Sequence, residues 1–122
     1  MIGPITTPVF QILLSLVDRD LHGYAIIQDI AARTDGEVRL TASTLYAAVK
    51  RMLDAGLIEE LAHRPRGAKD DPRRRYYRIT RQGLDAARTE ARRLERLAAM
   101  ARSKRLLPRL PRLRPTSTET GS

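Results

Sequence analysis

The chain has 122 residues, of which 42% are hydrophobic and only 4% aromatic, so it is expected to form one small domain with, at most, a tail. It contains no cysteine, which excludes disulfides and thiolate metal sites. Residues 1–60 contain five Lys and Arg and eight Asp and Glu, whereas residues 61–122 contain 18 Lys and Arg and six Asp and Glu. The net charge of the whole chain is +9. A general preference for arginine accounts for part of this excess. Its clustering suits a polyanionic partner such as nucleic acid.

No apolar run reaches the roughly 18–20 residues needed to cross a bilayer. The N-terminus also lacks the basic region and long apolar stretch of a signal peptide. We therefore expect a soluble, cytoplasmic protein that does not bind a membrane.

Two helices are predicted within the first 35 residues. Thr7 can cap the first helix, and Pro8 at the first helical position has no N–H to leave unbonded. Apolar residues follow at the spacing of one helical face. The second helix begins near Gly23, and Gly36 lies just past its end, where a left-handed residue commonly stops a helix.

A third helix is predicted to be capped by Thr41 or Ser43 and to end at Gly56. Its core-facing stripe, at i, i+3, i+4 and i+7, consists of Leu45, Ala48, Val49 and Met52. The other side is polar, small or basic and consists of Ser43, Tyr46, Ala47, Lys50 and Arg51. Such an amphipathic helix can enter the major groove of DNA.

A charged hairpin follows the third helix. Residues 57–63 and 75–79 are predicted strands, with Tyr77 and Ile79 on one face of the second. The intervening residues 64–74 are too polar to pack and form a long hairpin tip. Together with the adjoining Arg75, the tip carries six cations and two acids. A basic loop beside an amphipathic helix can hold phosphates while the helix reads bases.

A long fourth helix is capped by Thr80, and its apolar seam steps by three and four residues, as in a heptad. The seam consists of Leu84, Ala87, Ala91, Leu94, Ala98 and Ala101, broadened by Leu97 and Met100. It can pack on a partner helix or fold back on the first helix of its own chain. A membrane surface is disfavoured, because the apolar face is small and lacks aromatic anchors.

Three helices, a two-stranded hairpin and a long final helix predict a mainly α fold with a small β-hairpin (α+β), a winged helix-turn-helix. The chain resembles the PadR-like transcriptional regulators at three motifs, LHGYAI (residues 21–26), STLYAAVKRMLDAGLIEE (43–60) and RRRYYRITRQG (73–83). These are small bacterial winged-helix proteins, mostly repressors, that dimerise through the C-terminal helix. The resemblance covers about residues 8–103.

The resemblance implies a winged helix-turn-helix DNA-binding domain in residues 1–79 and a C-terminal dimerisation helix in residues 80–104. Residues 105–122 are expected to be a basic, disordered tail, or alternatively a flexible arm that follows phosphates. Two residues depart from the family pattern: Ala47 stands where a proline is usual, and Ser43 where a glycine is frequent. These departures concern the first turn of the third helix.

The residues expected to contact DNA lie on the outer side of the third helix and in the hairpin tip, or wing: Thr41, Ser43, Thr44, Tyr46, Lys50, Arg51, Arg64, Arg66, Lys69, Arg73, Arg74 and Arg75. Thr41 and Ser43 can alternatively serve only as caps, and Tyr46 can pack on a neighbour. The resemblance favours a DNA-facing Tyr46. The expected dimerisation residues are Leu84, Ala87, Ala91, Leu94, Leu97, Ala98 and Ala101.

We therefore expect a homodimeric regulator, a repressor, that binds a pseudo-palindromic operator in double-stranded DNA. The resemblance also implies a small aromatic or drug-like effector, as in some relatives. The alternative is a winged-helix adaptor that binds a protein partner.

An enzyme is not expected. The sequence has no carboxylate pair, Ser–His pairing, phosphate-cradling glycine loop or metal-ligand spacing, so no catalytic residue, metal or cofactor is predicted. His22 and His63 are interpreted as incidental. Tyr77, Thr80 and Gly83 are interpreted as structural residues.

Overall fold

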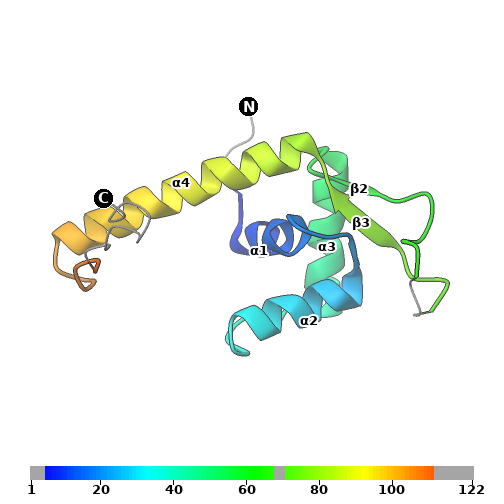
Figure 1. Ribbon diagram of the computed structural model, residues 1–122, viewed down its shortest axis with the longest axis horizontal. Helices are drawn as coiled ribbons and strands as arrows, with labels where there is room; N and C mark the ends of the chain where they lie inside the picture. The colour runs from blue at the N-terminus through cyan, green and yellow to red at the C-terminus, as the bar shows by residue number, and fades with distance from the viewer. Residues whose placement is uncertain (1–4, 68–70, 112–122) are drawn as a thin grey trace, which may run out of the picture. The chain divides into compact units, whose positions relative to one another are not determined.

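The computed structural model of the chain describes residues 5–67 and 71–111. The elements follow in the order α1 (Thr7–Leu16), β1 (Leu21–His22), α2 (Gly23–Arg33), α3 (Ala42–Asp54), β2 (Ile58–Glu60), β3 (Tyr76–Ile79) and α4 (Arg81–Ser103) (Figure 1). They divide into two compact units, Met1–Ala91 and Arg92–Ser122, with the boundary inside α4. The expected α+β winged helix-turn-helix is confirmed.

Helices α1, α2 and α3 supply most of the core of the first unit. The side chains that are at most 1% exposed include Ile12, Leu13, Leu16, Ile26, Ile30, Leu45 and Met52. Burying one such side chain stabilises the fold by about 1.5–3 kcal/mol relative to leaving it exposed. The predicted core stripe of α3 is confirmed, since all four of its residues are buried.

The N-terminal cap of α1 lies one residue earlier than predicted. Thr6, not Thr7, has the extended backbone of a cap, and its Oγ1 accepts a hydrogen bond from the Val9 N–H at 3.4 Å. Pro8 is therefore the second helical residue rather than the first. Both threonines are good caps, and only the backbone path before the helix decides between them.

Helix α3 ends as the sequence predicts. Gly56 has a φ of +76°, and its N–H bonds to the Leu53 carbonyl at 3.1 Å. The Leu57 N–H then bonds to the Met52 carbonyl at 2.9 Å, which completes a Schellman motif. This turn delivers the chain directly into β2.

The sheet has a strand that the sequence did not predict. Three antiparallel strands lie in the order β1-β3-β2, where only the β2–β3 hairpin was expected. In β1, Leu21 pairs with Tyr77 and His22 with Tyr76. Two residues are too short a run to show strand periodicity, so β1 is recognisable only through its partner. The hairpin strands are also shorter than predicted.

The predicted structural roles of Thr80 and Gly83 are confirmed at the start of α4. Thr80 Oγ1 accepts from the Gly83 N–H at 3.0 Å and donates to the Gly56 carbonyl at 2.6 Å. A Cβ at Gly83 would collide with the Leu57 carbonyl oxygen. Gly83 therefore allows the start of α4 to lie close against the turn after α3.

The second unit contains the C-terminal half of α4. Arg105 (φ +64°) ends the helix, and the Leu106 N–H bonds to the Ala101 carbonyl at 2.9 Å. Residues 106–111 form neither helix nor strand, and the predicted disorder of residues 112–122 lies outside the described residues. Among the residues described, no helix has the length and apolar character required to span a bilayer.

A polar network joins α1 to α2. Asp29 accepts hydrogen bonds from Ser15 Oγ at 2.7 Å, Arg33 Nε at 2.8 Å and Arg19 at 3.1 Å. Arg33 also donates to Ser15 Oγ at 2.8 Å, and Ser15 is only 2% exposed. Burial by itself would raise the pKa of Asp29, but these hydrogen bonds and the two arginine charges outweigh it and hold the pKa below its ordinary value of 3.8.

We expect the Asp29→Asn variant to lose about 1–3 kcal/mol of unfolding free energy at pH 7, because the buried Ser15 and the two arginines lose a charged acceptor. Since the folded pKa of Asp29 is lowered, the unfolded chain binds more protons, and the contribution of Asp29 is complete above about pH 4. It is lost as the pH falls through the folded pKa.

Urea denaturation of both proteins at pH 7 and pH 3 measures this difference. The gap between wild type and variant should shrink at pH 3. The exposed Asp18→Asn provides the control and should show little change at either pH. An equal gap at both pH values would contradict the role of the Asp29 charge.

Candidate nucleic-acid interface

The start of α3 presents three exposed hydroxyl side chains. Thr41 is the cap, and its Oγ1 accepts from the Thr44 N–H at 3.1 Å. The same hydroxyl lies 3.2 Å from Ser43 Oγ and donates to Thr44 Oγ1 at 3.0 Å. Of the two predicted caps, the structure therefore selects Thr41, while Ser43 and Thr44 extend an exposed polar cluster at the helix start.

The outer side of α3 continues with exposed polar and basic residues. Tyr46, Lys50 and Arg51 are exposed, and Tyr46 retains 49% of its surface. The phenol of Tyr46 also lies directly against Gly23. A Cβ at Gly23 would collide with the phenol oxygen. Tyr46 thus packs on a neighbour, as the alternative interpretation proposed, and still faces solvent.

The C-terminal arm of the wing is ordered by an acid. Asp71 Oδ1 accepts from the Arg73 backbone N–H at 2.9 Å, and the Asp71 carbonyl accepts from the Arg74 N–H at 3.0 Å. The Arg73 guanidinium returns to the same carboxylate, with one bond of 3.1 Å. Asp71 therefore caps the turn, while Asp70 lies outside the described residues.

The other wing cations differ in their surroundings. Arg73 is 91% exposed at its side chain, Arg66 is exposed and Arg64 is half-buried. Arg75 lies 3.8 Å from Glu60 of β2 and keeps 73% of its side-chain surface. Lys69 lies outside the described residues.

His22 joins the start of α2 to the wing, so the interpretation of this histidine as incidental is wrong. Its Nδ1 accepts from the Ala25 N–H at 3.1 Å and so caps α2. Its ring meets the Tyr76 ring edge-on at 5.3 Å, and Arg74 Nη1 lies 3.0 Å from Nδ1. The signal that could have found it is an acceptor-bearing side chain immediately before the predicted helix start at Gly23.

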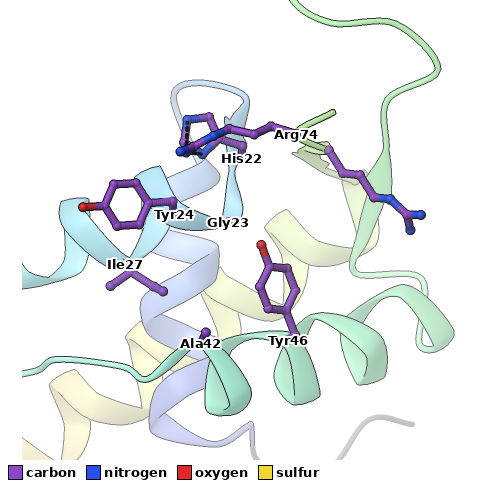
Figure 2. A pocket seen from close by; sticks show the side chains of 8 residues that line it. His22, Gly23, Tyr24, Ile27, Ala42, Tyr46 and Arg74 are labelled. Carbon is purple, nitrogen blue, oxygen red and sulfur yellow. Dashed lines mark hydrogen bonds between the residues drawn. The ribbon is translucent and has the colours of Figure 1, made fainter. Parts of the chain in front are cut away.

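A hollow of about 320 Å³ opens between the starts of α2 and α3 and the arm of the wing (Figure 2). It is lined by His22, Gly23, Tyr24, Ile27, Ala42, Tyr46, Arg74 and Arg75. Figure 2 shows Arg74 reaching across to His22, with Tyr24 and Tyr46 on separate walls. Apolar walls and a cationic rim can receive a ligand with a negative group and an apolar body.

A second hollow, of about 440 Å³, links α3 to the wing. Its lining residues are Tyr46, Asp71, Arg73, Arg74, Arg75 and Tyr77. Burial, together with the charge of Glu60, raises the pKa of Tyr77, so its hydroxyl stays protonated near neutral pH. The two hollows bring Tyr46 and the arginines 73–75 to one surface, although they are almost 30 residues apart in the chain.

The predicted dimerisation residues have two environments. Leu94 and Leu97 are 40% and 46% exposed on the second unit, next to Met100 at 58%. Ala87, in contrast, is buried in the core of the first unit, so little of its surface is available to a partner helix.

Comparison with known proteins gives consistent similarities. Residues 12–89 match the transcriptional regulator PadR-like family. The chain is 35% identical over 72 residues to an uncharacterized protein of Lysinibacillus sphaericus, over 59% of this chain and 63% of that one, less than two thirds of its length.

Two solved structures are also similar. A transcriptional regulator of Clostridium thermocellum has 26% identity and a TM-score of 0.67, over 81% of this chain and 96% of that one. The PcaV transcriptional regulator of Streptomyces coelicolor, in complex with its natural ligand, has 24% identity and a TM-score of 0.63, over 80% and 61%. At 24% identity, the similarity to PcaV supports only the fold of this chain.

Proposed function

The chain belongs to the PadR-like family of transcriptional regulators, and from this premise we propose that it binds double-stranded operator DNA as a homodimer and represses transcription. Membership makes the chain a DNA-binding regulator rather than an enzyme. Operator binding, dimerisation and repression are proposals that go beyond family membership. Binding to chromosomal DNA would place the protein in the cytoplasm.

The observation that carries the proposal is the single surface formed by the outer side of α3 and the wing. Tyr46 and the arginines 73–75 line one hollow together with Asp71 and Tyr77. On this surface the exposed Lys50 and Arg51 can reach base edges in the major groove. The hydroxyls of Thr41, Ser43 and Thr44 suit phosphates at the edge of the groove.

The wing is proposed to add affinity more than sequence choice. Arginine binds phosphate through paired hydrogen bonds and can enter a narrow minor groove. We assign this role to the six wing cations: Arg64, Arg66, Lys69, Arg73, Arg74 and Arg75. Their contribution is electrostatic, so it should decline as salt increases.

The C-terminal half of α4 is the proposed dimer contact. Leu94, Leu97 and Met100 leave an apolar stripe exposed on a helix whose other sides are arginine-rich. Ala91, Ala98 and Ala101 would let a partner helix approach closely. Pairing of two such helices would place two α3 helices on half-sites about one helical turn apart.

We also propose that a small aromatic or drug-like molecule controls DNA binding. The support is similarity of fold: PcaV, which shares the architecture, forms a complex with a natural ligand. An adaptor for a protein partner remains the competing function, and the Lys50 experiment below distinguishes the two.

The operator experiment is fluorescence anisotropy with DNA from upstream of the chain's own gene and with shuffled DNA of the same composition. At physiological salt, we expect the upstream DNA to bind at least roughly 10³-fold more tightly. Lys50→Ala should reduce this preference without changing the oligomeric state. Equal affinity for both DNAs at every salt concentration would reject operator binding and favour the adaptor.

The wing can be tested by the salt slope of binding. Removing Arg73 and Arg75 together (Arg73→Ala with Arg75→Ala) should weaken binding to every sequence and reduce the slope of log K against log salt by about 2. The control removes the same charge from α4, with Arg88→Ala and Arg96→Ala, and should leave the slope near that of wild type. An unchanged slope in the wing variant means that these arginines do not touch phosphates.

The dimer contact can be tested with Leu97→Glu, which places a charge in the exposed apolar stripe of α4. At micromolar concentration this variant should sediment as a monomer and bind operator DNA roughly 10-fold or more weakly, since two half-sites no longer bind together. Arg92→Gln, an exposed residue far around the helix from Leu94 and Leu97, changes the net charge equally and should remain dimeric. A dimeric Leu97→Glu protein would place the contact elsewhere.

A further inference from the structure

Arg74 differs from its neighbours in the groups that orient it. Arg73 is bonded to Asp71, and Arg75 lies 3.8 Å from Glu60. The Arg74 guanidinium lies 5.2 Å above the centre of the Tyr24 ring, and its Nη1 is 3.0 Å from His22 Nδ1. Both rings can orient the planar guanidinium group.

The same contacts attach the wing to the start of α2. His22 and Arg74 are 52 residues apart in the chain, and His22 pairs with Tyr76 across the β1–β3 ladder. Because His22 Nδ1 also accepts the Ala25 N–H, one imidazole serves as helix cap and as neighbour of the arginine. The position of Arg74 thus depends on two residues of the helix-turn-helix rather than on the wing alone.

The place where Arg74 is held has the chemistry of a backbone-phosphate site. The residues that line the hollow beside it include Arg75, Tyr24 and Tyr46. The eight described residues that line it include no carboxylate. The guanidinium group can donate two parallel hydrogen bonds to a phosphate, and the apolar walls suit the deoxyribose attached to that phosphate.

We propose that His22 and Tyr24 are positioning residues that hold the Arg74 guanidinium over the hollow between α2, α3 and the wing, where it binds one phosphate of the DNA backbone. This inference rests on the DNA binding of the proposed function. Arginine has many rotamers, and an arginine held in its bound geometry before contact loses less freedom on binding. Tyr24 and His22 therefore contribute to DNA affinity through Arg74.

The test is a double-mutant cycle on the full-length chain, with Tyr24→Leu, Arg74→Ala and the double variant. Affinity is measured by anisotropy on operator and on shuffled DNA over a series of salt concentrations, and thermal unfolding is measured in parallel. Arg74→Ala should weaken binding about 10-fold on both DNAs and lower the salt slope by about 1. Tyr24→Leu should weaken binding roughly 2–5-fold, the range of an exposed cation–π contact.

The double variant decides the inference. If Tyr24 acts through Arg74, the double variant binds like Arg74→Ala alone, so the two effects do not multiply. Tyr24→Phe keeps the ring and should bind like wild type. His22→Asn keeps a good helix cap, so it should unfold near the wild-type temperature yet bind as weakly as Tyr24→Leu.

Two outcomes would overturn the inference. One is multiplication of the Tyr24→Leu and Arg74→Ala effects, and the other is a Tyr24→Leu protein that binds DNA with wild-type affinity and salt slope. Either result in a chain that still prefers its operator leaves the proposed function intact. A wild-type chain that binds operator and shuffled DNA equally would instead overturn the operator function itself.

Discussion

Strand β3 is only four residues long, yet it pairs with β1 on one side and with β2 on the other. β1 runs directly into α2, and β2 follows the turn that ends α3. β3 itself leads through Thr80 into α4. The wing leaves the sheet between β2 and β3. The elements of the proposed DNA-binding surface are therefore connected through the hydrogen bonds of one short strand, which the buried Tyr77 anchors in the core.

In the proposed function, this arrangement would separate the residues that give DNA affinity from the residues that give sequence choice. The buried side of α3 fixes the helix on the core, so its outer side is free to present Lys50 and Arg51. The wing supplies the arginines 73–75 to the surface that Tyr46 of α3 also lines. Phosphate contacts give affinity without sequence information, whereas groove contacts discriminate between bases. A regulator needs both on one surface, and the hollow lined by Tyr46 and the arginines 73–75 brings them together.

Small size explains the use of polar contacts inside the domain. A chain of this length buries a modest fraction of its surface and has few aromatic residues to add to the core. The network of Asp29, Ser15 and Arg33 compensates with directional bonds between α1 and α2. Hydrogen bonds to a charged partner are stronger than neutral ones, and they also fix the orientation of the two helices. The pair then presents a defined platform to α3.

The sequence by itself determined the features that depend on neighbouring residues: the core stripe of α3, the glycine stop at Gly56, the Thr80 cap and the basic wing. Helical periodicity and capping are local, so a single chain shows them. The tertiary structure alone decided that Thr6 caps α1, that β1 joins the sheet and that His22 contacts Arg74. The last two bring together segments more than 50 residues apart. A local pattern carries no record of its distant partner, because pairing is chosen by the packing of the whole domain.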